Sequence, residues 1–446
     1  MNKKILLLSL LSTTLFAGTI TFYQNLGGNS GNVYMYAVGP SVGPGTGVSF
    51  LQVAHGPAVY NVNVSSYATP GATLTETIST EAQAQVPYHS AGTVSGLWVM
   101  VNSNGITANS TVRVRINGVN GNEVVTIGSG VTGEVRDTTH TDTINSGDKI
   151  DYLITAGASG TNIGLVGIAT VFTPSTVNQG FLKWCASGAP FASSTNGFAT
   201  YYEPVSGILG SGGGFANQTE SINSYKMATA GTFSHMGVYV NTNGRAGTTT
   251  INFRKNGANG NQTISIGAGV TGLLEDNSHT DTVVVGDTVT YAVVMDGGGG
   301  SNTFSASFIE SEYTTTNSIM EYPAQTQGHS FNSNDANIMT IQGALGFDAA
   351  EAGDYQVLGQ VPGTFSNMHI YVQTNTLNQA ITIRFRKNHA NGNQVITIPA
   401  GLAGYFEDTT NSDTVNAGDE IDYRETVPAA TGSAAFSYLG SKFTHQ

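Results

Sequence analysis

The residues with the clearest capacity for chemistry lie in an acidic turn that occurs three times along the chain. In each copy, three aspartates recur at the same intervals, five and then six residues apart. Clustered carboxylates and hydroxyls can bind Ca²⁺, which takes roughly six to eight oxygen ligands. The same residue types also cap turns by bonding to their own backbone, and we favour this interpretation over calcium binding. The nine candidate ligands are Asp137, Asp142, Asp148, Asp276, Asp281, Asp287, Asp408, Asp413 and Asp419.

A zinc site in the same turn would need histidine or cysteine ligands in every copy. His140 and His279 occupy equivalent positions in the first two copies, but Asn411 replaces them in the third. Structural zinc is bound by four such ligands. The sequence therefore argues against a repeated zinc site, and we expect no cofactor apart from the calcium alternative.

Catalytic groups are equally hard to find. Ser211 is flanked by glycines but lacks the strand-to-helix context of a nucleophile elbow. Cys185 follows Trp184 in an apolar strand pattern and is interpreted as a packed thiol. Glycosidases need a carboxylate pair in a cleft, whereas the available pairs are interpreted as solvated charges on loops and strand faces. These pairs are Glu76 with Glu81, and Glu310 with Glu312. The sequence therefore predicts a protein that is not an enzyme.

The elements that carry the acidic turns are three homologous repeats. Blocks that begin at Gly92, Gly231 and Gly363 stay in register without a gap, and successive blocks are offset by 139 and then 132 residues. A period of this size corresponds to an independent domain and is too long for a solenoid unit. We therefore predict a signal-like apolar segment at 1–17, followed by three domains. Their predicted ranges are 18–174, 175–314 and 315–446.

Short joints rich in Thr, Ser and Asn separate the repeats, and they predict a stiff linear string of domains. Each repeat is predicted to open with a short apolar strand, at 20–23, 181–184 and 319–322. Between this strand and the gapless block, each repeat has a segment that differs in length and sequence from the others. These segments include 39–47, 207–214 and 343–354. Variable loops on a repeated scaffold are where specificity is usually placed, so we expect them either to contact partners or to be unconstrained surface.

Alternation of apolar and polar residues predicts β-strands throughout. Residues 112–115, 251–254 and 383–386 alternate in this way, which is typical of half-buried strands. Two Asn-Gly pairs follow in the first two repeats, but His389 replaces the first glycine of the third, so the second pair is expected to form the tight turn. Short strands at roughly ten-residue spacing predict an all-β fold of three tandem jelly-roll-like β-sandwich domains.

Composition supports this fold class and excludes several functions. The chain has 57 Gly among 446 residues, and only 10% of residues are charged. Its net charge of −13 argues against nucleic-acid binding and against anionic membrane surfaces. The lone cysteine cannot form an internal disulfide, so stability must come from packing.

The amino-terminal segment resembles a secretory signal peptide in its order of features. Lys3 and Lys4 precede an apolar run at 5–16, and Ala17 follows. The run is too short to span a bilayer comfortably, so no membrane insertion is expected. Leu15 stands where a cleavage site would have a small residue, so an apolar strand or anchoring segment that stays on the protein remains the alternative.

The hairpin blocks also resemble a known family. Residues 253–257 and 385–388 form an Arg-Lys-Asn hairpin, and an Asp-Thr-Thr-x-x-Asp turn and an Ala-Gly-Asp corner follow in the third repeat. This pattern is similar to a jelly-roll repeat found in phage structural proteins and other surface proteins. The first repeat departs from it, with Ile116 in place of the lysine. The resemblance implies a building block of fibres, decoration proteins or adhesins.

These observations predict a non-enzymatic structural or adhesive protein on the exterior of an assembly, most simply a virion component such as a head fibre, capsid decoration or tail fibre. The alternatives are a secreted bacterial surface fibre or matrix protein, and a carbohydrate-binding array. We expect the chain to be a homo-oligomer or to bind other structural proteins of the same assembly, either on the virion or at a cell surface. A surface glycan is a further candidate partner. Its aromatic platform would be Trp98, Trp184, Tyr201 and Tyr202.

Overall fold

The fold is all-β, and its three tandem β-sandwich domains confirm the predicted fold class. The computed structural model describes residues 48–72, 78–193, 198–209, 219–295, 303–316, 318–332, 336–344 and 357–446. The signal-like segment 1–17, the loop 39–47, and most of 207–214 and 343–354 lie outside these residues. In the described part of the chain, no helix is long and apolar enough to cross a membrane.

Each sandwich consists of two five-stranded sheets. We call the sheet that contains the opening strand of a domain the inner sheet, and the other the outer sheet. The first domain has an inner sheet of β1 (Phe50–Asn61), β10 (Gly160–Pro174), β4 (Gly92–Ile106), β7 (Gly133–Arg136) and β8 (Thr141–Ile144). Its outer sheet contains β2 (Ser65–Ala68), β3 (Val86–Tyr88), β9 (Asp148–Thr155), β5 (Ser110–Ile116) and β6 (Val119–Ile127). A short 3₁₀ helix, η1 (Glu81–Gln83), precedes β3.

The second and third domains repeat this arrangement. The second has an inner sheet of β13 (Gly207–Ile208), β11 (Gly180–Ser193), β20 (Phe304–Thr315), β15 (Gly231–Asn243) and β18 (Gly272–Val283). Its outer sheet contains β12 (Ala199–Glu203), β14 (Tyr225–Lys226), β19 (Thr288–Met295), β16 (Thr249–Lys255) and β17 (Ala258–Ile266), and the helix α1 (Glu220–Asn223) precedes β14. In the third domain, the inner sheet is β23 (Gly343–Ala344), β21 (Ile319–Asn332), β30 (Ser433–His445), β25 (Gly363–Asn375) and β28 (Gly404–Val415). The outer sheet is β22 (Ala336–Met339), β24 (Val357–Gly359), β29 (Asp419–Thr426), β26 (Ile381–Lys387) and β27 (Ala390–Ile398).

One buried tyrosine joins the two sheets of each sandwich. Tyr152 on β9 bonds to Thr170 on β10 at 2.8 Å. The equivalent pairs are Tyr291 with Ser311 at 2.8 Å and Tyr423 with Ser441 at 2.6 Å. Burying a phenol requires a partner for its hydroxyl, and these bonds fix the distance and register between the sheets.

The tight turn of the hairpin lies at the first asparagine of the motif, and the prediction that placed it at the second was wrong. β5 and β6 pair Ile116 with Val119, which leaves a two-residue loop at 117–118. Both loop residues have positive φ, as a type I′ turn requires. In the third domain, Asn388 and His389 adopt the same conformation, with φ of 50° and 64°. A histidine therefore tolerates the position that glycine occupies in the other two domains.

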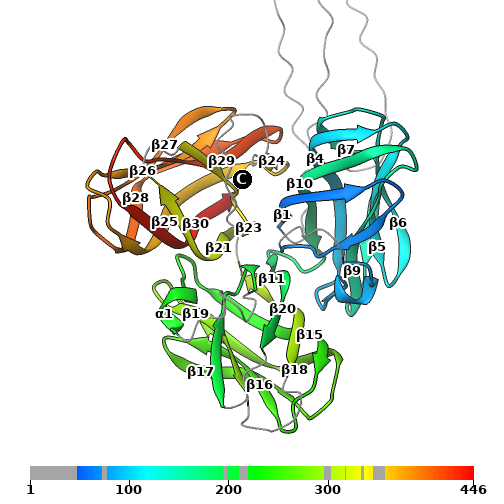
Figure 1. Cartoon of the computed structure of the whole chain (residues 1–446), viewed down its shortest axis with the longest axis horizontal. Helices are drawn as coiled ribbons and strands as arrows, with labels where there is room; N and C mark the ends of the chain where they lie inside the picture. The colour runs from blue at the N-terminus through cyan, green and yellow to red at the C-terminus, as the bar shows by residue number, and fades with distance from the viewer. Residues whose placement is uncertain are drawn as a thin grey trace, which may run out of the picture.

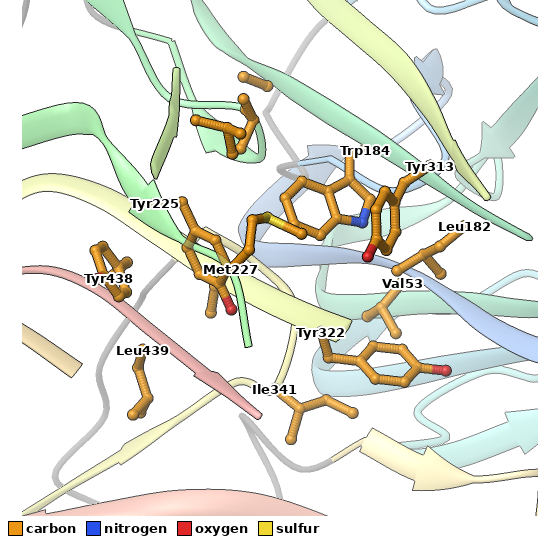
Figure 2. Packing of buried hydrophobic residues seen from close by; sticks show 14 of the residues in the cluster. Val53, Leu182, Trp184, Tyr225, Met227, Tyr313, Tyr322, Ile341, Tyr438 and Leu439 are labelled. Carbon is orange, nitrogen blue, oxygen red and sulfur yellow. The ribbon is translucent and has the colours of Figure 1, made fainter. Parts of the chain in front are cut away.

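The three sandwiches surround a common centre, so the predicted linear string of domains is wrong. The opening strands β1, β11 and β21 face this centre, where β23 also lies (Figure 1). Residues of all three domains belong to one continuous hydrophobic core. Figure 2 shows Val53 of the first domain, Trp184 of the second and Tyr322 of the third within this core. Because the buried apolar surface is shared, the domains form one packed body.

Candidate functional site

The first aspartate of each acidic turn accepts hydrogen bonds from the backbone. Asp137 Oδ2 accepts from Val124 N at 3.1 Å, and its Oδ1 accepts from Thr139 N at 3.0 Å. Partial burial acts to raise the pKa of this carboxyl, but these amide donors outweigh it and hold the pKa well below its usual range. The same balance of burial and amide donors lowers the pKa of Asp276 and of Asp408 to about 2.

The second aspartate is anchored to the strand that follows the hairpin. Asp142 Oδ1 accepts from Asn122 N at 2.7 Å, and the equivalent bond from Asn261 N to Asp281 is also 2.7 Å. A side chain on Gly121 would lie 2.6 Å from Asp142 Oδ2, which is too close. The second glycine of the Asn-Gly motif is therefore needed for the approach of this carboxylate.

The third aspartate closes a local turn and reaches the hairpin tip. Asp148 Oδ2 accepts from Asn145 N at 2.7 Å, and its Oδ1 accepts from Asn117 Nδ2 at 2.7 Å. Asp287 and Asp419 repeat both bonds in their own domains. The nine aspartates thus hold the strands and hairpins together through backbone and amide donors. In the part of the chain that the structure describes, no three His, Cys, Asp or Glu residues gather as a metal site. Calcium binding stays a prediction.

The predicted aromatic platform does not form on the surface. Trp98, Trp184 and Tyr201 are buried. Trp184 packs edge-on against Tyr225, with ring centroids 5.5 Å apart. The fourth residue, Tyr202, lies beneath the guanidinium of Arg254. Of the catalytic candidates, Ser211 and Glu76 lie outside the described residues. Burial of Cys185 raises the pKa of its thiol well above the usual value, which disfavours the reactive thiolate.

Three seams between domains are the most elaborate polar features of the molecule. In each, a short outer-sheet strand of one domain (β3, β14 or β24), with the residues that follow it, contacts the inner sheet of the next. The first seam places 86–90 of the first domain on the second domain, and the second seam places 225–229 of the second domain on the third. The third seam returns to the first domain: Leu51 N donates to Tyr322 Oη at 3.0 Å, and the side-chain amide of Gln360 lies against Gly96. The chain therefore closes into a ring of three domains.

The first seam contains buried charges that the sequence suggested were solvated. Glu310 and Glu312 are buried, so that interpretation was wrong. Lys183 Nζ lies 2.6 Å from Glu310 and 3.7 Å from Glu312. Burial raises the pKa of Glu310 to about 8 despite the lysine. Burial also acts to raise the pKa of Glu312, but Lys183, His235 and the His89 amide hold it below its usual range. One lysine is therefore shared by two buried carboxyls whose pKa values are shifted in opposite directions.

Two histidine rings stack over this charge cluster. The rings of His89 and His235 come from different domains and are 4.3 Å apart at an angle of 11°. His89 N donates to Glu312 at 2.5 Å, and His89 Nε2 lies 2.7 Å from Glu275. His235 also has a positive φ of 51°, as do Gly96 and Asn367 at the equivalent positions. The same backbone kink thus presents a different residue at each seam.

The second seam is centred on one buried carboxylate. Glu321 accepts hydrogen bonds from Tyr225 Oη at 2.9 Å, from Ala228 N at 2.8 Å and from Thr229 N at 2.9 Å. His369 Nε2 lies 3.2 Å from the same carboxylate. Strand pairing places Glu321 at the position of Lys183 in the second domain and of Leu51 in the first. A single repeat position therefore carries an anion, a cation or an apolar residue, according to the seam.

A groove of about 400 Å³ opens along the second seam. One wall is a row of three tyrosines on adjacent strands of the third domain, because Tyr371 pairs with Tyr405 on one side and with Tyr438 on the other. The opposite wall belongs to the second domain. It consists of Glu220, Ser221, Ser224, Lys226, Asn256, Gly257 and Thr288. This size and mixture of aromatic and polar groups are typical of small-molecule sites, so the groove is the candidate site of the protein.

Sequence reasoning did not identify the groove or the charged seams. Their residues come from repeats more than a hundred positions apart, for example Tyr225 and His369. Alternation revealed which residues of each strand share a face, but not that another domain covers that face. The available signal was a break in the repeat, since Leu51, Lys183 and Glu321 differ where a purely structural position would be expected to stay alike.

Comparisons with known proteins give little guidance. No family model matches the chain, and no curated protein matches it. A similar solved structure is that of infectious bursal disease virus, Gx strain, with 11% sequence identity and a TM-score of 0.18 over 92% of this chain and 84% of that one. A likeness this weak supports no argument about function.

Proposed function

We propose that this protein is a non-enzymatic structural or adhesive component on the exterior of an assembly, and specifically a virion component such as a head fibre, capsid decoration or tail fibre. The observation that carries the proposal is the closed ring of three sandwiches made by one chain. Buried carboxylates join domain to domain: Glu312 of the second domain accepts from His89 N of the first, and Glu321 of the third accepts from Ala228 N of the second. A head of this kind is rigid and needs no partner copy to complete its seams.

Two further observations support this role. The acidic turns serve the backbone, with the carboxylates of Asp137 and Asp142 both anchoring strand β6. The Arg-Lys-Asn hairpin resembles jelly-roll repeats of phage structural proteins. In this proposal, copies of the head associate with each other or with other structural proteins through the outer faces, because the inner edge strands are already covered.

Immunogold labelling of material from the native source tests the proposal. Labelling of the surface of purified virions is the expected result, and labelling confined to cells or to the culture medium would overturn the virion assignment. Intact mass of the same material adds an independent reading. A chain that retains residues 1–17 fits assembly without export.

The second candidate is a secreted bacterial surface fibre, and the segment at 1–17 favours it. Its order of lysines, apolar run and small residues is that of a signal peptide. A mass that corresponds to a chain beginning at Gly18, together with labelling of the cell surface, would favour this candidate over the virion component.

A further inference from the structure

We propose that the groove along the second seam binds a saccharide that carries a carboxylate. The inference deepens the adhesive role proposed above by naming the ligand class. The groove volume of about 400 Å³ suits one or two sugar rings. Its two walls differ in chemistry, and each matches a different part of such a ligand.

The aromatic wall matches the apolar face of a pyranose ring. Tyr371 and Tyr438 stack with their ring centroids 6.0 Å apart at an angle of 19°, and Tyr405 continues the row on the neighbouring strand. Tyr371 and Tyr405 are half-buried, so part of each ring faces the groove. Axial C–H groups make one face of a sugar ring apolar, and such a face packs on an aromatic ring. The hydroxyls at the ring edge remain free to form hydrogen bonds.

The polar wall matches those hydroxyls. Ser221 supplies an exposed hydroxyl that can donate and accept hydrogen bonds, and the hydroxyls of Ser224 and Thr288, which donate to Glu220 O and Asn256 Oδ1, keep lone pairs that can accept. Gly257 leaves open space beside them, because nothing lies near the position of its absent side chain. Because both walls are held by a buried seam, the groove exists before a ligand arrives and loses little entropy on binding.

The charge of the groove selects an anion. Lys226 Nζ lies 3.7 Å from the centroid of the Tyr405 ring, and no carboxylate of the described residues forms an ion pair with it. The nearby acids have partners: Glu220 is bound by Arg254 Nε at 2.9 Å and by its Nη2 at 2.8 Å, and Glu407 accepts from Tyr405 Oη. Among the described residues, the groove thus presents a cation with no carboxylate partner, in a chain with a net charge of −13. A ligand carboxylate complements it.

The row of tyrosines is specific to this seam. Strand pairing places Leu273, Tyr239 and Phe308 at the equivalent positions in the second domain. In the first domain the row is Glu134, Met100 and Gly167. The residue equivalent to Lys226 in the first domain is Pro87. The combination of three tyrosines with a lysine therefore occurs only once among these three rows.

The test measures binding of the full chain to immobilised oligosaccharides that end in uronic or sialic acid, beside neutral oligosaccharides of the same linkage. We expect the acidic ligands to bind at least about tenfold more tightly than the neutral ones. Lys226→Gln should remove this preference and leave neutral binding unchanged. Tyr371→Ala should abolish binding of both. Tyr239→Ala, at the equivalent position in the second domain, is the matched control and should bind like the wild type.

Two outcomes overturn the proposal. One is absence of binding to every acidic oligosaccharide, and the other is equal binding of acidic and neutral ligands that Lys226→Gln does not alter. Melting temperatures of all variants exclude a loss of folding as the cause. Immunogold labelling of the native material stays independent of these results, so failure of the saccharide site and failure of the exterior role can be distinguished.

Discussion

The first and third seams use equivalent strands but opposite chemistry. In the first, the second domain presents Lys183, Glu310 and Glu312, all buried. At the corresponding positions of the third seam, strand pairing places Leu51, Ala169 and Val171 of the first domain. Both seams are closed, so a buried ion cluster is not needed to join two of these domains.

The difference shows what the charges can contribute. Burying ions costs desolvation free energy that their attraction repays only in part, whereas apolar residues of similar volume pack at no such cost. A charged seam is therefore weak support for stability. It does discriminate, because a cation beside the wrong seam would face apolar residues. We infer that the three different residues at this position help to fix which domain contacts which.

Among the substitutions considered, removing Lys183, the cation of the first seam, should have the largest effect on the free energy of unfolding. Lys183→Leu copies Leu51 but leaves two buried carboxyls without their cation. We expect a loss of about 3–5 kcal/mol in the free energy of unfolding, measured by urea denaturation. Lys183→Leu combined with Glu310→Ala and Glu312→Val copies the whole apolar set and should recover most of the loss. A triple variant no more stable than the single one would show that the two seams are not interchangeable.

A substitution in the second seam should lower the free energy of unfolding by a smaller amount. Glu321→Gln replaces one acceptor oxygen with a donor and removes the charge from hydrogen bonds with four donors, namely Tyr225 Oη, Ala228 N, Thr229 N and Thr229 Oγ1. We expect the unfolding free energy to fall by about 2 kcal/mol, again by urea denaturation. Glu420→Gln removes a carboxylate from a partly exposed contact with His389 and serves as the control. It should change stability by less than about 1 kcal/mol, and equal effects of the two variants would contradict the role of Glu321.

The three repeats also differ at one buried position that accepts a backbone hydrogen bond. Leu97 N donates to Glu123 at 3.0 Å, while Gln262 and Gln394 accept the equivalent bonds in the other domains. Burial raises the pKa of Glu123 to about 8, so the unfolded chain releases this proton at a lower pH than the folded protein does. The free energy of unfolding therefore falls as the pH rises from about 4.5 to about 8.

Glu123→Gln should remove that penalty and make the first domain resemble the other two. We expect little change in melting temperature at pH 4 and a gain of about 1–2 kcal/mol in stability at pH 9. Thermal unfolding at the two pH values provides the measurement. A variant that is destabilised equally at both pH values would indicate that folding does not raise the pKa of Glu123.

The smallest effect should come from removing calcium, since the acidic turns are the feature that all three repeats share. Oxygens of Asp137, Asp276 and Asp408 already accept backbone hydrogen bonds. We therefore expect EDTA to leave the melting temperature unchanged. A fall that added Ca²⁺ reverses would instead reveal a bound ion, because a ligand of the folded state stabilises it by mass action.

The sequence by itself determined the fold class and the repeated strand pattern. Period-two alternation and Asn-Gly turns act within a few residues, so they are visible without a structure. Turn preferences read from the sequence were less reliable where contacts with other parts of the fold decide the backbone conformation. His389 suggested that the turn had moved, whereas its backbone adopts the conformation of the glycine it replaces. The second glycine is instead required by the approach of an aspartate from another strand, as with Gly121 and Asp142.

Only the tertiary structure decided the ring, the buried charges and the groove. Glu310 and Glu312 lie on a strand whose side chains alternate between two faces. This alternation is the same whether the face that carries the two glutamates is exposed to water or covered by another domain. Whether water or another domain covers that face depends on contacts such as that between His89 and Glu312, which are 223 residues apart in the chain. Desolvation depends on everything packed around a group, so neither the pKa of Glu310 nor the tyrosine row beside Lys226 could be inferred until the three domains were placed together.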